Sequence, residues 1–134
     1  MTGLVLKLSP GERILINGAV VENCDRKARI AIMSPNVRVL RLRDAIHPED
    51  AATPVSRVCY ICQLLITGDA DELQAKEQAL RGIEQLSRAL GDVDSHRALE
   101  RAAKALVQGQ HYQAMKWLRS LLPMEARLLA RHQQ

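Results

Sequence analysis

Residues 13–22 read RILINGAVVE, two short apolar segments on either side of the dipeptide Asn17-Gly18. Asparagine and glycine both tolerate positive φ angles, so this dipeptide is a strong signal for a two-residue β-hairpin turn. The pattern predicts one strand over Arg13–Ile16 and a returning strand over Ala19–Glu22. The first part of the chain therefore contains an antiparallel hairpin.

Further strands are predicted on both sides of this hairpin. Upstream, leucines alternate along residues 4–8 before a Ser-Pro-Gly turn. Downstream, Ala28, Ile30 and Ile32 form one face of a predicted fourth strand, with Arg29 and Met33 on the other. A fifth strand is predicted over residues 37–43. Strict alternation places Arg41 and Arg43 on one of its faces and the neighbouring leucines on the other.

The second part of the chain carries apolar residues at helical spacing. Thr53-Pro54 predicts the start of a first helix, because threonine caps a helix and proline suits its first turn. Leu73 is expected on the apolar face of the second helix. The four helices are predicted to run from Thr53 to Gly68, from a cap at Asp69 to Gly91, from a cap at Ser95 to Gly109, and up to Pro123. Residues 125–132 are expected to add a last turn or two.

These elements predict an α+β fold. A small N-terminal antiparallel β-sheet lobe is expected over residues 1–52, followed by a C-terminal bundle of about four helices over residues 53–134. A chain of 134 residues suits one domain, or two small lobes that share one core, and one compact unit is expected.

Positive charge is concentrated in the strand half. The block from residue 26 to residue 43 contains no acidic residue and six basic ones: Arg26, Lys27, Arg29, Arg38, Arg41 and Arg43. Such a block favours an anionic partner such as RNA, and a solvated strand face would explain it equally well. Aromatic residues are scarce and absent from this block, so contacts to RNA would use charge and polar groups rather than base stacking.

Chemical motifs are few. Cys59 and Cys62 form a C-x-x-C pair, but they fall on the apolar face of the first predicted helix and are interpreted as core residues. The alternatives are a redox pair, or a zinc site that Cys24 and His47 would complete. The sequence contains no phosphate loop, dinucleotide fingerprint or nucleophile elbow. We therefore expect no catalytic residues, no metal, no cofactor and no enzymatic activity.

The last predicted helix carries more apolar width than one buried face requires. Its residues Tyr112 and Trp117 are candidates for binding a protein partner, because tyrosine and tryptophan are favoured anchors at interfaces. The alternative is that Trp117 fills the core of the helical lobe.

Location is inferred from three features. The longest apolar run, Val58–Ile66, is too short to span a bilayer, and the first residues lack the regions of a signal peptide. Three cysteines, an odd number, fit a reducing compartment. We expect a cytoplasmic protein without a membrane partner, and a homo-oligomer is compatible with the sequence.

Three stretches resemble the FlbT proteins of flagellated bacteria. They are GERILINGAVV at residues 11–21, LRLRDAI at residues 40–46 with the following Pro48-Glu49, Ala52-Thr53-Pro54 and Arg57, and YQAMKWLRSLLP at residues 112–123. The resemblance implies a post-transcriptional regulator that acts on the 5′ untranslated leader of flagellin mRNA, in most members as a repressor that promotes message decay. The sequence departs from the family at residues 59–62, where bulkier aromatic residues are expected.

The strand half is also similar to the carbon storage regulator family, which binds mRNA leaders through a basic strand that ends in Arg-Glu. Arg43-Asp44 lies near the corresponding place, which draws attention to Arg41 and Arg43. A shared fold does not establish function by itself. Arginines on an edge strand also deter aggregation. Alternatively, Arg41 or Arg43 would pair with Asp44 or Glu49 and fix the polar connector expected over residues 44–52.

Two functions follow. The first is an RNA-binding regulator whose basic strand surface contacts the flagellin mRNA leader. The second is an adaptor whose helices bind another flagellar regulatory protein, so that its effect on mRNA is indirect.

Overall fold

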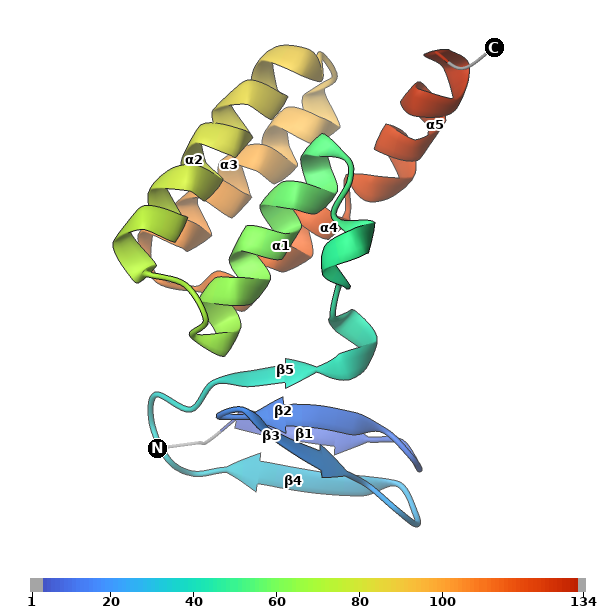
Figure 1. Ribbon diagram of the computed structural model, residues 1–134, viewed down its shortest axis with the longest axis vertical. Helices are drawn as coiled ribbons and strands as arrows, with labels where there is room; N and C mark the ends of the chain where they lie inside the picture. The colour runs from blue at the N-terminus through green and yellow to red at the C-terminus, as the bar shows by residue number, and fades with distance from the viewer. Residues whose placement is uncertain (1–3, 133–134) are drawn as a thin grey trace. The chain divides into compact units, whose positions relative to one another are not determined.

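The computed structural model describes residues 4–132 and separates into two compact units, Met1–Ala45 and Ile46–Gln134. Every strand lies in the first unit and every α-helix in the second, as the predicted α+β fold requires (Figure 1). The division falls at residue 45, before the connector that the sequence analysis assigned to the β lobe. The backbone of Ile46 exchanges two hydrogen bonds with the side chain of Gln63, of 2.6 and 3.1 Å, which attaches the connector to the helical unit.

The β unit contains two small antiparallel sheets. Strands β1 (Leu4–Leu8) and β4 (Ala28–Ile32) form one sheet, and β3 (Ala19–Glu22), β2 (Arg13–Ile16) and β5 (Val39–Arg41) form the other in that order. Their inner faces share a core built from Leu6, Leu8 and Ile14, with partly buried Ile16, Ile30, Ile32 and Val39 packed against it. The first three strands have the bounds that the sequence predicted, and β4 ends at Ile32, one residue before the predicted Met33.

The fifth strand is shorter than predicted. It ends at Arg41, and residues Leu42–Asp44 form a short 3₁₀ helix, η1. The register explains this difference, because Arg41 pairs with Ile14 and the partner strand β2 begins only one residue earlier, at Arg13. A strand continued to Arg43 would extend past the beginning of β2 and have no residue to pair with.

The predicted hairpin turn is present. Asn17 and Gly18 have φ angles of 50° and 86°, the left-handed values that this two-residue turn requires. The turn also anchors the approach to β5. The backbone N–H of Asn17 donates to the carbonyl of Arg38 at 2.8 Å, and the backbone N–H of Arg38 donates to Oδ1 of Asn17 at 2.9 Å.

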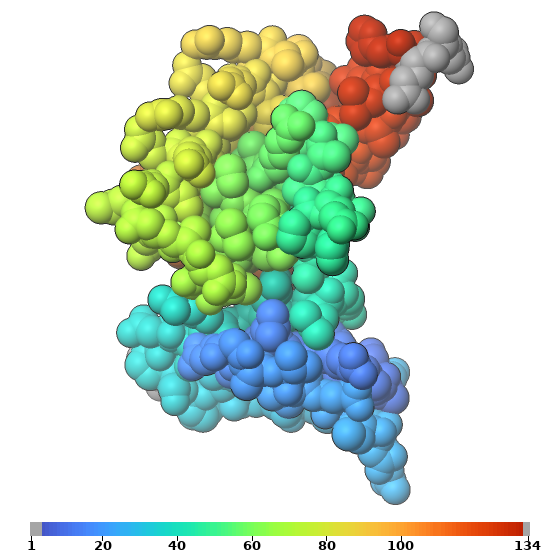
Figure 2. Space-filling model, in the orientation of Figure 1, coloured from blue at the N-terminus to red at the C-terminus, as the bar shows by residue number. Residues whose placement is uncertain are grey.

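The helical unit contains five helices: α1 (Pro54–Thr67), α2 (Glu72–Ala89), α3 (Val93–Val107), α4 (His111–Arg119) and α5 (Leu122–His132). It begins with a short 3₁₀ helix, η2 (Pro48–Asp50). The fifth helix corrects the prediction that the helix before it stops at Pro123. Proline is tolerated in the first turn of a helix, and Pro123 is the second residue of α5 instead of the end of α4. Helix α5 extends away from the packed helices (Figure 2).

The helix caps follow the predicted chemistry but not always the predicted residue. Thr53 caps α1 in a reciprocal arrangement with Ser56, as expected. The caps of α2 and α3 are Asp71 and Asp92, not Asp69 and Ser95. Each of these two carboxylates accepts a hydrogen bond from the backbone N–H three residues later, that of Gln74 for Asp71 and that of Ser95 for Asp92.

The core of this unit lies among α1, α2, α3 and α4, and α1 packs against both α2 and α4. Cys59 and Cys62 are fully buried in it, in agreement with their interpretation as small core residues. Leu73 is 78% exposed, so its expected place on the buried face of α2 is wrong. Among residues 4–132, no helix is both long and apolar enough to cross a membrane.

Candidate nucleic-acid interface

Net charge is confined to the β unit. Residues 1–45 contain eight lysines and arginines against four aspartates and glutamates, which leaves a formal charge of +4. Residues 46–134 contain eleven of each kind and are neutral. The whole formal charge of the chain, +4, therefore belongs to its smaller unit. A cationic surface of this kind attracts a polyanion.

Two cations face each other across the β1–β4 sheet. Lys7 is the register partner of Arg29, and both side chains are exposed on the face that turns away from the core. Like charges directly opposite each other destabilise a sheet. Neither side chain forms an ion pair with another residue in the range 4–132 that would relieve the repulsion. The pair therefore forms an exposed cationic site on this face of the sheet.

Lys7 was missed by the sequence analysis. It lies outside the acid-free block and stands alone between two leucines, so its immediate sequence carries no charge signal. Only the register of β1 against β4, which joins residues far apart in the sequence, brings it beside Arg29.

The turn between β3 and β4 carries two more cations and projects from the β unit (Figures 1 and 2). Its conformation is fixed by the side-chain amide of Asn23, whose Nδ2 lies 2.8 Å from the carbonyl oxygen of Arg26 and 3.0 Å from that of Ser9. Arg26 and Lys27 are exposed and form no ion pair within the described part of the chain. The turn leads directly into β4 and Arg29.

Arg38 is a further exposed cation, in the loop before β5. Its backbone is held on both sides by Asn17, as described above, while its side chain has no carboxylate partner among the residues that the structure describes. The backbone is therefore fixed and the guanidinium group is available to a ligand.

Arg41 has a different environment. Its register partner is Ile14, a core residue, so Arg41 lies on the core-side face of β5 and its side chain is only 16% exposed. Nη1 of Arg41 donates to Oε2 of Glu12 at 2.7 Å and to the carbonyl of Lys7 at 3.0 Å. The alternation of Leu40 and Arg41 was predicted correctly, but the face with Arg41 turns inward.

Glu12 is the carboxylate that holds this corner together. Its side chain is only 7% exposed, and Oε1 accepts a hydrogen bond from the backbone N–H of Ser9 at 3.0 Å. This backbone hydrogen bond, followed by the hydrogen bond and charge of Arg41, lowers the pKa of Glu12 below its ordinary value. Arg43 approaches the same carboxylate from farther away, with Nε at 3.7 Å and 61% of its side chain exposed.

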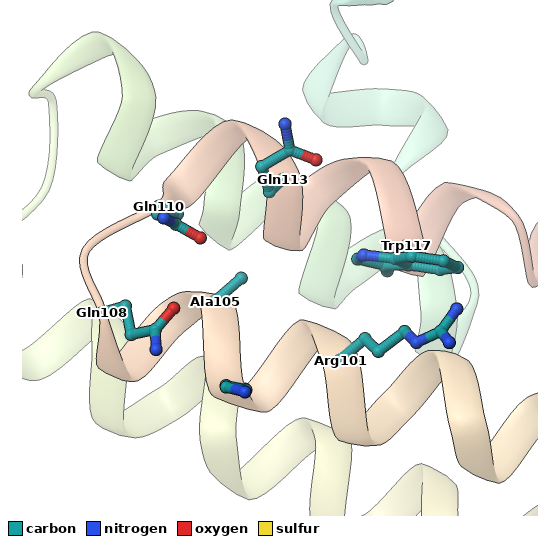
Figure 3. Close-up of a pocket in the computed structure, with 7 residues that line it drawn as sticks. Arg101, Ala105, Gln108, Gln110, Gln113 and Trp117 are labelled. Carbon is teal, nitrogen blue, oxygen red and sulfur yellow. The ribbon is translucent and has the colours of Figure 1, made fainter.

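The two residues predicted to bind a protein partner, both on α4, lie in different surroundings. Tyr112 is 43% exposed, whereas Trp117 is partly buried and has the guanidinium group of Arg101 over its ring, 4.7 Å from the centroid. Trp117 and Arg101 line an open hollow between α3 and α4 (Figure 3). Tyr112 does not line it.

Metal and thiol chemistry find no support in the described residues. Residues 4–132 contain no group of three or more histidine, cysteine, aspartate or glutamate side chains arranged to hold a metal ion. Burial raises the pKa of the Cys59 and Cys62 thiols to about 12, so both are protonated near neutral pH. A thiol of that kind is a poor nucleophile.

Comparison with known proteins adds a family. The model of the family described as "Flagellar protein FlbT" matches residues 4–129. The chain is 32% identical over 126 residues to a "Probable flagellum biosynthesis repressor protein FlbT" of Mesorhizobium japonicum, covering 94% of this chain and 84% of the relative. A protein of the same name from Allorhizobium ampelinum is also 32% identical, with 94% and 83% covered. One from a Caulobacter species is 31% identical, with 91% and 92% covered. No solved structure matches the chain.

Proposed function

The chain belongs to the FlbT family of flagellar proteins, and we propose that it binds the 5′ untranslated leader of flagellin mRNA and represses translation or promotes decay of the message. Family membership gives it a regulatory role in flagellar synthesis, because its relatives are named as flagellum biosynthesis repressors. Repression through RNA is the finer statement that we argue here. Such a regulator acts in the cytoplasm, where the message is translated, and it needs no catalytic residue.

The observation that carries the proposal is the pairing of Lys7 with Arg29. A protein gains nothing in stability from two like charges placed opposite each other on an exposed face. A phosphate backbone that crosses this face would neutralise both charges and release their counterions. Arg26, Lys27 and Arg38 extend the cationic surface around the same unit. We call these five side chains the basic surface.

The chemistry of the basic surface favours phosphate contacts over base stacking. The β unit, residues 1–45, contains no aromatic residue. The aromatic residues of the chain all lie in the helical unit: Tyr60, Tyr112 and Trp117. RNA modules that read bases on a sheet need aromatic rings on that sheet. The basic surface would therefore supply affinity through charge, and selectivity would come from the shape of the leader and from polar contacts.

Arg41 and Arg43 take separate roles in this proposal. Arg41 is a positioning residue, because its hydrogen bonds to Glu12 and to the Lys7 carbonyl tie β5 to the strand that carries Lys7. Arg43 keeps most of its side chain in solvent, and its Nε lies 3.7 Å from the Glu12 carboxylate. It therefore stays a candidate for RNA contact.

The test is direct binding of a labelled flagellin leader RNA to the purified protein, with no other factor present. We expect binding that weakens as salt is added, and weaker binding to an unrelated RNA of equal length. The variant Lys7→Gln with Arg29→Gln should lower the salt slope of log affinity by roughly 1.4, about 0.7 for each lost phosphate contact.

The matched control is Arg127→Gln with Arg131→Gln, which removes the same charge from two exposed positions on α5. It should leave affinity and slope close to those of the unchanged protein. Absence of binding by the purified protein would reject direct RNA recognition. It would favour the second candidate, a protein adaptor, for which the hollow beside Trp117 is the supporting observation.

A further inference from the structure

The helical unit is neutral as a whole, but its charges are unevenly placed. Residues 101–124 contain no aspartate or glutamate and four cations: Arg101, Lys104, Lys116 and Arg119. This stretch covers the end of α3 and all of α4. The stretch itself thus contributes no carboxylate where these two helices meet, although Oε1 of Glu72 on α2 lies 3.6 Å from Nε2 of His111 at the start of α4.

The hollow between α3 and α4 lies within this acid-free stretch. It is lined by Arg101, Lys104, Ala105, Gln108, Gln110, Gln113 and Trp117. Its volume is about 310 Å³, at the lower limit for small-molecule sites, and it is open to solvent. Cations, amides and one aromatic ring line it, and no carboxylate does. These properties describe a contact surface rather than an enclosed pocket.

Arg101 is oriented by its neighbour. Its guanidinium group lies over the ring of Trp117, with Cζ 4.7 Å from the ring centroid, and its side chain runs along the Trp117 end of the hollow (Figure 3). A planar guanidinium held in this way is suited to a carboxylate, which it binds with two parallel hydrogen bonds. Lys104 follows three residues later on the same helix and therefore lies on the same face.

The three glutamines add a second kind of contact. Gln108 follows the end of α3, and Gln110 and Gln113 belong to the start of α4, and all three line the other half of the hollow (Figure 3). Each amide offers both a donor and an acceptor, the combination that a peptide backbone requires. Ala105, which is buried, forms an apolar floor between the two halves.

We propose that this hollow docks an acidic segment of a partner protein, with carboxylates on Arg101 and Lys104 and its backbone on the glutamine amides. Charge complementarity is the argument, since the hollow is cationic and lies in a stretch without carboxylates. RNA fits less well, because Arg101 covers the face of Trp117 on which a base would stack and the helical unit has no net charge to attract a polyanion. The inference is independent of RNA binding by the basic surface.

Trp117 provides the measurement, because it is the single tryptophan of the chain. The probe is a short peptide of glutamate, glycine and leucine, titrated against the intact protein while tryptophan fluorescence is recorded. The same peptide with glutamine in place of glutamate is the peptide control. We expect the acidic peptide to change the emission of Trp117 in a saturable, salt-sensitive manner, and the neutral peptide to have no effect.

Variants assign the effect to the hollow. Arg101→Gln with Lys104→Gln should weaken peptide binding at least about tenfold, since hydrogen bonds to charged groups are lost. Arg127→Gln with Arg131→Gln removes equal charge elsewhere and should bind as the unchanged protein does. Arg101→Lys keeps the charge but loses the stacked fork, so it too should bind more weakly. Circular dichroism melting shows whether each variant is folded.

Three outcomes would overturn the proposal. The first is no response of Trp117 to the acidic peptide. The second is equal weakening by the α5 control, which would make the effect one of general charge. The third is a response to an oligouridylate RNA but not to the peptide, which would make the hollow a nucleic-acid site. Loss of RNA binding in the Lys7 and Arg29 variant would leave the peptide result unchanged.

Discussion

Nη1 of Arg41 lies 2.7 Å from Oε2 of Glu12, on the core-side face of the strand that was predicted to present its arginines to RNA. The neighbouring arginine, Arg43, reaches the same carboxylate only at 3.7 Å and remains mostly exposed. The sequence predicted the same role for both arginines, but the structure largely buries Arg41 and leaves Arg43 exposed. Stability and RNA binding can be tested separately at these two positions.

Single substitutions should separate the two arginines. Arg41→Ala should lower the melting temperature, because it leaves the Glu12 carboxylate in a poorly solvated place without its cation. Arg43→Ala should keep the melting temperature and reduce affinity for the leader RNA. Thermal melting and RNA titration of both variants provide the measurement. An Arg41→Ala protein that melts like the unchanged one would show that the Glu12 pair contributes little.

Glu12 should give the stability an acid-sensitive component. Its pKa in the folded chain is lowered, first by the Ser9 backbone hydrogen bond and then by Arg41. A carboxylate with a lowered folded pKa stabilises the fold above its unfolded pKa, and this contribution is lost as pH falls through the folded value. Glu12→Gln should therefore reduce the free energy of unfolding near neutral pH. Below pH 4.5, the ordinary pKa of a glutamate, the variant should lose less of its stability than the unchanged protein does.

Melting curves recorded from neutral to acidic pH would measure this effect. Asp25→Asn is the matched control, because Asp25 is exposed and forms no ion pair within residues 4–132. Parallel curves for Glu12→Gln and the unchanged protein would contradict the expectation.

Reversing one charge on the β1–β4 sheet should raise the stability of the fold and lower its affinity for RNA. Lys7→Glu places a carboxylate opposite Arg29, so a repulsive cross-strand pair becomes an attractive one. We expect a gain of about 0.5 kcal/mol in the free energy of unfolding, as for other exposed cross-strand pairs. RNA affinity should fall, because a phosphate contact is replaced by a negative charge. A variant that binds RNA as before would remove Lys7 from the basic surface.

Glu125 should support the start of α1 from the other end of the chain. Its Oε2 accepts a hydrogen bond of 2.8 Å from the backbone N–H of Val55, and the residue is buried. Glu125→Ala leaves that buried N–H without a partner, which should cost about 1–3 kcal/mol. Glu125→Gln keeps an acceptor oxygen and should cost less. Chemical denaturation ranks the three proteins, and equal losses for both variants would reject the capping role.

Gly82 should resist replacement by alanine although it lies within a helix. Alanine normally favours a helix interior over glycine by about 1 kcal/mol. Here a Cβ at Gly82 would lie 2.5 Å from Cγ2 of Val58, a buried and stiff side chain on α1. Gly82→Ala is expected to destabilise by about 1–3 kcal/mol. In a denaturation series, the double variant with Val58→Ala should lose less than the sum of the single variants.

The strands were predictable because their signals are local. Alternation and the Asn17-Gly18 turn define four strands by residues that are close in sequence. The inward position of Arg41 was not predictable in this way. Alternation separates Leu40 from Arg41, but the pairing of β5 with β2 decides which of the two shares a face with Ile14.

The same distinction explains the candidate sites. The exposed cations of residues 26–38 follow from a run of charge that is visible in the sequence. Lys7 beside Arg29 and Arg101 over Trp117 depend on pairings between distant segments, which no local pattern encodes. Likewise, Asp69 and Asp71 are both plausible caps, and only the backbone geometry at the start of α2 selects Asp71.

The order of the strands has a consequence for folding kinetics. Strands β2 and β3 are joined by two residues, and such hairpins form within about 1–10 μs. Strand β1 then pairs with β4, although the β2–β3 hairpin separates them in the sequence. This step is slower, because the chain between the two strands must be ordered before they pair. Lys7 and Arg29 come together only in this closure. A chain arrested before it would hold all its charges but would not present the cationic pair.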